Sequence, residues 1–168
     1  MKLGEEAIIR LTSANKDEAL RELSALAVRL EENLNEDKVF RALVQREKMG
    51  STGIGGGVAI PHAKVEGVPV KLLALGYHGK GIAYDSADRR PVQVLALLLG
   101  QPGPNHEYLQ ALGKLGRMLR DNNNLEMLLN AQEPAKLDTV FTRMLHSAAR
   151  LAPPHSIEDP VPDIPCRL

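Results

Sequence analysis

His62 stands in a sequence context that would hold its side chain in one position. It directly follows Pro61, which comes after a short apolar run, Val58–Ile60. Proline fixes its own φ and moves the residue before it toward extended geometry, so the imidazole would be presented at a defined place. A neutral imidazole, with an ordinary pKa near ~6.5, is a competent nucleophile. These residue types favour covalent chemistry on His62.

The stretch before the apolar run, Ser51–Gly57, is rich in glycine and reads STGIGGG. Because glycine lacks a Cβ, backbone N–H groups in such a stretch can come close to an anion and form a concave binding surface. Phosphoryl transfer depends mainly on positioning and on electrostatic support of the moving charge. A fixed histidine beside a glycine-rich N–H surface meets both demands, so phosphoryl transfer through His62 is one interpretation of this stretch. The residues expected to cradle the phosphate are Ser51, Thr52, Gly53 and Gly55.

Two other interpretations of the same stretch make different demands on the sequence. A P-loop needs Gly-Lys-Ser/Thr at the start of a helix, and the dinucleotide fingerprint needs spaced glycines between a strand and a helix. Here Val-Ala-Ile-Pro follows the glycines, and this strand-like run argues against nucleotide binding. The remaining alternative is a tight turn followed by a histidine that only satisfies its own hydrogen bonds.

The helices that precede the glycine stretch would place Arg46 beside it. Apolar residues at helical spacing predict a first helix from about Lys16 to Glu31, with Asn15 and Glu18 forming a capping box. A second helix is predicted to begin near Asn35 and to stop at Gly50. The apolar residues that it would bury are Val39, Phe40, Leu43 and Val44. Arg46 then lies in the last turn, where a cation suits the helix dipole.

Apolar runs farther along the chain predict strands and more helices. Strands are expected at Val58–Ile60, Val70–Tyr77 and Val92–Leu99, and the last run is typical of a central strand covered on both faces. Helices are expected after an N-cap at Asn105, around Leu125–Ala131 and from near Pro134. Their expected core residues are Leu109, Leu112, Leu115, Leu119, Leu137, Val140, Phe141 and Met144. Strands that alternate with helices indicate an α/β layer architecture.

Length, charge and cysteine content limit the class of protein. The 168 residues suit one domain, assigned to residues 1–150, with a proline-rich tail at residues 151–168 that we expect to lack fixed structure. The 21 basic and 21 acidic residues balance, which argues against binding to nucleic acid or to an anionic membrane. A single cysteine, Cys166, and the lack of a long apolar stretch predict a cytoplasmic protein without membrane insertion.

Longer segments around these residues carry a resemblance to a known family. The segment REKMGSTGIGGGVAIPHAK, residues 46–64, resembles the active-site segment of enzyme IIA domains of the bacterial phosphotransferase system, mannitol/fructose class. The closest similarity is to the nitrogen-regulatory branch. The resemblance runs from about Ala7 to Leu145 and includes NKDEALREL, GIAYDSADRRPVQVLALLL and YLQALGKLGRMLRD.

The resemblance implies both a fold and an activity. The fold would be a three-layer α/β sandwich, phosphotransferase/anion transport protein-like, with a mixed β-sheet flanked by helices on both sides. The activity would be that of a phosphocarrier, formally a phosphotransferase, in which His62 accepts a phosphoryl group from a small histidine-containing phosphocarrier protein. Arg46 would offset the phosphate charge. The phosphoryl group would pass to a IIB protein, or the phosphorylation state would signal to a regulatory target.

One position departs from the family pattern. The family usually places a second histidine at the start of the later helix, where this chain has Tyr108, and His106 lies two residues earlier. Tyr108 could donate a hydrogen bond from the first helical turn, where N–H groups favour anions. Alternatively, Tyr108 is a packing residue and His106 is solvated. Both interpretations remain open at this point, as does the choice of imidazole nitrogen.

Three functions therefore compete. The lack of a fused IIB or membrane segment favours a nitrogen-regulatory phosphocarrier over a sugar-specific IIA component for fructose or mannitol. Because Tyr108 stands where the family usually has a second histidine, a third function stays open, that of a binding regulator that carries no phosphate. We expect no diffusible cofactor, and no histidine pair shows metal-ligand spacing, so no metal site is predicted. Asp85 and Asp88 are expected to be turn residues, and a homodimer is left open.

Overall fold

The computed structural model describes residues 3–151, with side chains described as far as residue 147. The predicted proline-rich tail therefore lies outside the described residues, except for Leu151, which ends the last helix. Cys166 also lies outside them. None of the helices in the described part combines the length and apolar character needed to cross a membrane.

A six-stranded mixed sheet forms the middle of the structure, in the order β1-β5-β6-β3-β2, with β4 also paired to β6. The strands are β1 (Ile8–Arg10), β2 (Gly53–Gly55), β3 (Val58–Ala59), β4 (His62–Lys64), β5 (Lys71–Ile82) and β6 (Val92–Gly100). β5 and β6 are antiparallel, whereas β1 is parallel to β5 and both β3 and β4 are parallel to β6. The nearly continuous apolar run is thus a central strand, as predicted.

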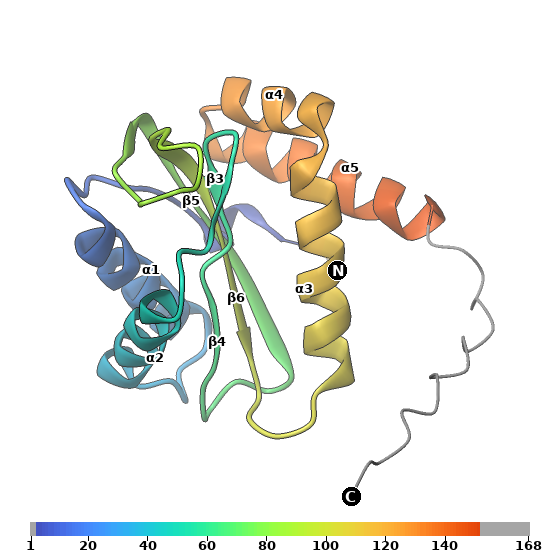
Figure 1. The fold of residues 1–168 in the computed structure, drawn as a ribbon. Helices are drawn as coiled ribbons and strands as arrows, with labels where there is room; N and C mark the ends of the chain where they lie inside the picture. The colour runs from blue at the N-terminus through green and yellow to red at the C-terminus, as the bar shows by residue number, and fades with distance from the viewer. Residues whose placement is uncertain (1–2, 152–168) are drawn as a thin grey trace, which may run out of the picture.

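Helices cover both faces of this sheet (Figure 1). On one side lie α1 (Lys16–Leu30) and α2 (Glu36–Lys48), and on the other lie α3 (His106–Arg120), α4 (Asn122–Asn130) and α5 (Pro134–Leu151). A short 3₁₀ helix, η1 (Glu5–Ala7), precedes β1. The expectation of a three-layer α/β sandwich is therefore confirmed.

Asparagine side chains begin three of these helices. Asn15 accepts from the Glu18 N–H at 2.9 Å, Asn35 accepts from the Lys38 N–H at 3.0 Å, and Asn105 accepts from the Tyr108 N–H at 3.0 Å. Each bond satisfies one of the N–H groups that the first helical turn leaves free. The sequence therefore located the starts of the two helices that precede the glycine stretch and of the helix that follows β6.

The side chains of β6 and of the facing helices make the core. Leu95, Leu97, Leu98 and Leu99 of β6 are fully buried, together with Leu115 of α3. The prediction for Leu109 is wrong, because this side chain is 58% exposed, while Tyr108 is only 4% exposed. Residues that were expected in the core but are only partly buried are Phe40, Val44, Leu112 and Val140.

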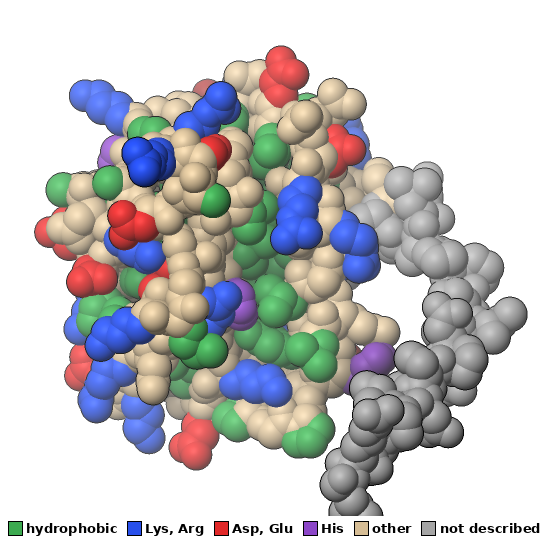
Figure 2. Space-filling view, in the orientation of Figure 1, with side chains coloured by type: hydrophobic (Ala, Val, Ile, Leu, Met, Phe, Trp, Pro, Cys, Tyr) green, Lys and Arg blue, Asp and Glu red, His purple; other side chains and the backbone are tan. Residues whose placement is uncertain are grey.

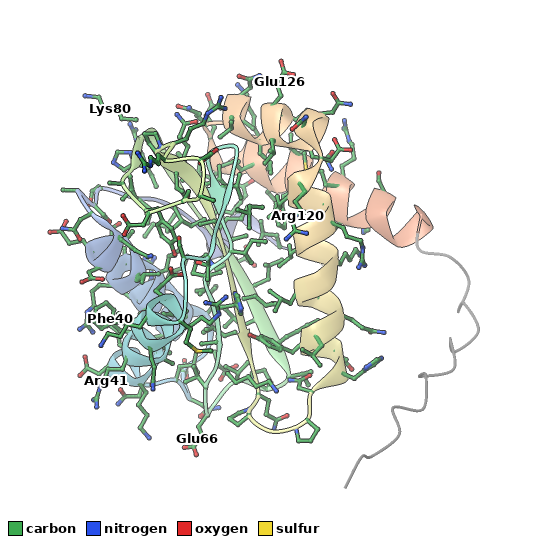
Figure 3. All side chains as sticks on the ribbon, in the orientation of Figure 1. Phe40, Arg41, Glu66, Lys80, Arg120 and Glu126 are labelled. Carbon is green, nitrogen blue, oxygen red and sulfur yellow. The ribbon has the colours of Figure 1, made fainter. Side chains whose placement is uncertain are left out.

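Contacts with neighbouring elements explain why Leu109 is exposed and why Phe40 is only partly buried. The helix register set by the Asn105 cap turns Tyr108 onto Gly100, where an added Cβ would lie 2.3 Å from the Tyr108 ring. Leu109 is therefore turned outward. The ring of Phe40 on α2, labelled in Figure 3, is covered by the guanidinium of Arg21 from α1, which lies 3.8 Å from the ring centre.

The contact between Gly100 and Tyr108 gives a stability prediction with a matched control. Gly100→Ala places a methyl group inside the volume of the Tyr108 ring, so we expect it to lower the free energy of unfolding by about 1–3 kcal/mol. Gly116→Ala, in the middle of α3, meets nothing within 4 Å and should raise stability by about 0.5–1 kcal/mol through helix propensity. Urea unfolding measures both. Equal shifts in the two variants would contradict the seating of Tyr108 on Gly100.

Candidate active site

His62 begins an edge segment that continues β3 past a proline. β3 pairs with Val94 and Leu95 of β6, and β4 pairs farther along the same strand, with His62 opposite Leu98. Between them the Pro61 carbonyl accepts from the Leu98 N–H at 3.0 Å. Proline has no N–H to offer a neighbouring strand, so this segment suits the edge of the sheet. The edge position leaves the His62 side chain only half-buried.

The two ring nitrogens of His62 have different partners. Nδ1 lies 2.7 Å from the Ile60 carbonyl oxygen, and Nε2 lies 3.2 Å from Nε of Arg46. A carbonyl only accepts and an arginine only donates, so Nδ1 carries the proton and Nε2 carries the lone pair. The imidazole is thus held as a single tautomer with Nε2 as the basic nitrogen.

Burial lowers the pKa of His62, and the positive charge of Arg46 lowers it further. The hydrogen bond to the Ile60 carbonyl and the charge of Glu47 act in the opposite direction, but the net pKa stays below the ordinary 6.5. The ring is therefore neutral near neutral pH, as a nucleophile must be.

This lowered pKa predicts how stability and ionisation change with pH. The folded protein binds the His62 proton less readily than the unfolded chain, so the free energy of unfolding should decrease as the pH falls below about 6.5. A ¹H–¹⁵N NMR titration should show the His62 ring protonating only below that value, and Arg46→Met should raise the pKa. A His62 pKa above 6.5 in the unmodified protein would contradict this account.

Arg46 projects from the last turn of α2 and is held from two directions. Its Nη1 donates to the Gly50 carbonyl at 2.8 Å while its Nε donates to His62. A guanidinium has five N–H donors, so others remain available for an anion in front of Nε2. The structure thus brings together the two residues that the sequence analysis paired.

The glycine stretch forms a tight hairpin rather than an open row of amides. Gly55, Gly56 and Gly57 all have positive φ, at 90°, 67° and 87°, in the turn between β2 and β3. Such values favour glycine over any residue with a Cβ. The glycines therefore serve the turn that leads into the His62 segment.

Several amide groups of this hairpin already have protein acceptors. The Thr52 N–H donates to Glu47 at 3.1 Å, the Gly53 N–H to Ser51 Oγ at 3.1 Å, and the Gly56 N–H to Asp88 at 2.9 Å. A phosphate would have to displace these acceptors. The phosphate cradle at Ser51, Thr52, Gly53 and Gly55 therefore stays a prediction.

Tyr108 lies near the site, and His106 does not face the core. The Tyr108 hydroxyl has no hydrogen-bond partner among the residues that the structure describes, and Nζ of Lys64 lies 5.7 Å from the ring centre. Burial raises the pKa of Tyr108, while the nearby charge of Arg46 acts to lower it. His106 is exposed at the first position of α3. The Tyr108 ring packs on Gly100, and whether its hydroxyl also donates to the site stays a prediction.

The site lies at the edge of the sheet, with one helical layer on either side (Figure 1). Arg46 comes from α2 in one layer and Tyr108 from α3 in the other. Figure 2 shows hydrophobic side chains gathered along a hollow between the strands and α3. Exposed apolar residues lie at both helix ends near the site, with Met49 at 81% and Leu109 at 58% exposure.

The sequence also led to predictions about two aspartates and about metal binding. Asp88 lies in a turn, as predicted, and accepts from the Gly56 and Arg90 N–H groups, whereas Asp85 lies in the preceding loop with a positive φ of 57°. Within the described residues, no three His, Cys, Asp or Glu side chains gather as a metal-binding group. Glu47, which directly follows Arg46 in the chain, was not predicted as a site residue from the sequence.

An edge histidine that faces an arginine, on a mixed sheet between two helical layers, defines a IIA-type phosphotransferase domain. The chain belongs to the family described as phosphoenolpyruvate-dependent sugar phosphotransferase system, EIIA 2, which it matches over residues 1–144. The resemblance seen in the sequence is thereby confirmed.

Named relatives and solved structures agree with this family. A nitrogen regulatory protein from Bradyrhizobium diazoefficiens is 36% identical over 137 residues, which cover 81% of this chain and 89% of the relative. The crystal structure of nitrogen regulatory protein IIA-Ntr from Neisseria meningitidis has a TM-score of 0.76 and 28% identity, covering 83% of this chain and 95% of that one. An Escherichia coli complex of enzyme IIA mannitol with phosphorylated IIB mannitol has a TM-score of 0.69 at 22% identity, over 87% and 98% of the chains, and shows the fold alone.

Proposed function

We propose that this protein is a phosphocarrier that accepts a phosphoryl group on Nε2 of His62. The observation that carries the proposal is the hydrogen bond from Nδ1 to the Ile60 carbonyl, because it fixes the tautomer and leaves the lone pair on Nε2. Arg46 lies beside that nitrogen and can bind the incoming phosphoryl oxygens. The donor would be the phosphorylated histidine of a small phosphocarrier protein.

The transfer step needs only the imidazole of His62 and the phosphorylated imidazole of the donor. The Nε2 lone pair forms a bond to phosphorus while the bond from phosphorus to the donor's imidazole nitrogen breaks, and that electron pair returns to the donor ring. No proton has to leave His62 during attack, because the proton on Nδ1 stays hydrogen-bonded to Ile60. The carbonyl also stabilises the positive charge that the ring gains as the new bond forms.

A nitrogen-regulatory role fits the relatives better than a role in the uptake of one sugar. The relative at 36% identity and the solved structure at 28% identity are both named as nitrogen regulatory proteins. The sugar-specific alternative draws support from the family description, which names a sugar phosphotransferase system. The downstream partner would be a regulatory target or a IIB protein, as in the mannitol complex. We place the protein in the cytoplasm, where its donor would be.

Phosphotransfer from a phosphorylated carrier tests the proposal directly. The unmodified protein should gain one phosphoryl group in intact mass, and the adduct should be acid-labile, base-stable and mapped to His62. His106→Ala, which removes the exposed histidine of α3, should gain the same adduct. Absence of any adduct on the unmodified protein would overturn the proposal and favour a binding regulator without phosphate.

A second measurement separates the two branches of the family. Cells that lack the protein should show altered control of nitrogen or potassium physiology and unchanged uptake of individual sugars. Restored uptake of fructose or mannitol on adding the gene to cells without their own IIA subunit would instead support the sugar-specific alternative.

Tyr108→Phe tests whether the tyrosine hydroxyl contributes to the site. The variant keeps the ring packing on Gly100 but removes the hydroxyl, which is the only group of this side chain that can donate to a phosphoryl oxygen. A hydrogen bond to a charged group contributes roughly 1.5 kcal/mol, so we expect phosphorylation to slow by about tenfold with little change in stability. A time course of phosphotransfer measures the rate, and urea unfolding measures the stability. An unchanged rate would leave Tyr108 with a packing role alone.

A further inference from the structure

Glu47 is an almost fully buried carboxylate that receives hydrogen bonds from three other segments of the chain. Its side chain is 7% exposed, and Nζ of Lys16, at the start of α1, lies 2.6 Å from Oε2. The Thr52 N–H donates to the carboxylate at 3.1 Å and the Tyr84 hydroxyl donates at 3.1 Å. The Thr52 hydroxyl also donates to it. A buried carboxylate with this many donors holds the groups that surround it in place.

Thr52, which Glu47 holds, is connected to the nitrogen that sets the His62 tautomer. The Thr52 carbonyl accepts from the Ile60 N–H at 3.0 Å, and the Ile60 carbonyl accepts from Nδ1 of His62 at 2.7 Å. Ile60 therefore bonds to Thr52 through its N–H group and to the imidazole through its carbonyl oxygen. Movement of Thr52 would move the acceptor that keeps the proton on Nδ1.

The second contact of His62 depends on the same turn. Arg46 is anchored by the Gly50 carbonyl at 2.8 Å, and Gly50 lies between the end of α2 and Thr52. Glu47 belongs to α2 and bonds to Thr52, so it closes this turn across Gly50. Both partners of the imidazole, Ile60 and Arg46, are thus fixed through a turn that Glu47 closes.

We propose that Glu47 is a positioning residue that acts through Thr52 to hold His62 as the Nδ1–H tautomer with Nε2 facing Arg46. This inference rests on the proposed phosphocarrier function and adds a residue to the same site. Lys16 has a supporting part, because its ammonium group offsets the negative charge of Glu47 and limits repulsion of an approaching phosphoryl group.

A second carboxylate in the chain provides a matched control. Glu22 accepts from the Thr12 N–H at 3.1 Å and 3.2 Å, from the Thr12 hydroxyl at 3.1 Å and from the Ser13 hydroxyl. It fixes a loop in the same manner as Glu47, but neither Thr12 nor Ser13 bonds to His62, Arg46 or Ile60. Glu22→Gln therefore reports the cost of weakening a loop carboxylate away from the site.

The test compares Glu47→Gln, Thr52→Val and Thr52→Ser with Glu22→Gln. We expect long-range ¹H–¹⁵N NMR of the neutral ring to show one Nδ1–H tautomer in the unmodified protein and a mixture in Glu47→Gln. Because misplacement of a reacting group by about 1 Å can cost roughly 100-fold in rate, phosphorylation of Glu47→Gln should slow by about 10–100-fold. Thr52→Val should show a smaller change of the same kind, and Thr52→Ser should restore both tautomer and rate.

Several results would overturn the inference. One is a single Nδ1–H tautomer with an unchanged rate in Glu47→Gln, and another is an equal loss of rate in Glu22→Gln. If Glu47→Gln fails to fold, the pair Thr52→Val and Thr52→Ser decides the question, and identical behaviour of the two contradicts the proposal. The tautomer is measured without any donor protein. It therefore decides the role of Glu47 even if the unmodified protein accepts no phosphoryl group and the proposed function fails.

Discussion

Replacing His62 with Gln is expected to abolish phosphoryl acceptance, because the variant removes the nucleophilic nitrogen and keeps most of the packing. A glutamine side-chain oxygen can accept from Arg46 in place of Nε2, so Arg46 keeps a hydrogen-bond acceptor at this position. Little loss of stability should therefore accompany the complete loss of function. Intact mass after incubation with a phosphorylated carrier measures the first effect, and urea unfolding measures the second.

The other described histidines should not replace His62. Nδ1 of His78 accepts from the Lys80 N–H at 3.2 Å, and His106 and His146 are exposed. Among the hydrogen bonds of the described residues, only the one to His62 joins an imidazole to an arginine. A phosphoryl adduct that persists in His62→Gln at the unmodified level would show that the chemistry lies elsewhere and would contradict the site.

The sequence located the elements that have strong local signals. Asn15 and Asn105 identified helix starts because the capping bond involves only residues within one turn. The β6 run identified a central strand because burial on both faces leaves Gln93 as its one polar side chain. In contrast, β1 and β4 have three residues each, which is too few to show a period, and they become strands only by pairing with β5 and β6.

The apolar pattern of the chain led to a wrong prediction of burial where a contact between two elements decides which side chain is buried. Leu109 has the spacing of a core residue, but it is exposed because Tyr108 occupies the space above Gly100. No feature of the helix sequence alone contains that contact, since Gly100 belongs to β6. The prediction of an apolar stripe therefore placed the core face of α3 one residue away from its true position at the first turn.

The candidate site was predictable in its membership and only partly in its geometry. Pro61 and the apolar run indicated that His62 is held, and the resemblance to the IIA family paired it with Arg46. The tautomer could not be predicted, because it depends on the orientation of the Ile60 carbonyl. Glu47 escaped notice because a glutamate at the end of a helix is ordinary, and only the fold brings Lys16, Thr52 and Tyr84 to it.

Arg46→Met is expected to slow phosphoryl acceptance by His62 by about 100-fold, which is the loss typical when one fixed donor to developing charge is removed. Two mechanisms contribute. Methionine cannot bind the phosphoryl oxygens, and loss of the positive charge raises the pKa of His62, so less of the ring is neutral at low pH. Arg46→Lys keeps the positive charge but loses the planar, forked donor group of arginine. Its phosphorylation rate should therefore lie between those of the unmodified protein and Arg46→Met. Rates near pH 6 and pH 8 distinguish the mechanisms.

A matched control for this prediction is Arg41→Met on the same helix. Arg41 is exposed on α2, and Figure 3 shows it on the outer side of that helix, pointing away from the sheet. Its loss should leave the transfer rate unchanged. At about pH 8 the His62 ring is neutral in every variant, so a remaining defect in Arg46→Met must come from lost contact with the phosphoryl group. If the defect disappears at that pH, Arg46 acts only on the ionisation of His62, and its assignment as the phosphate-binding residue is wrong.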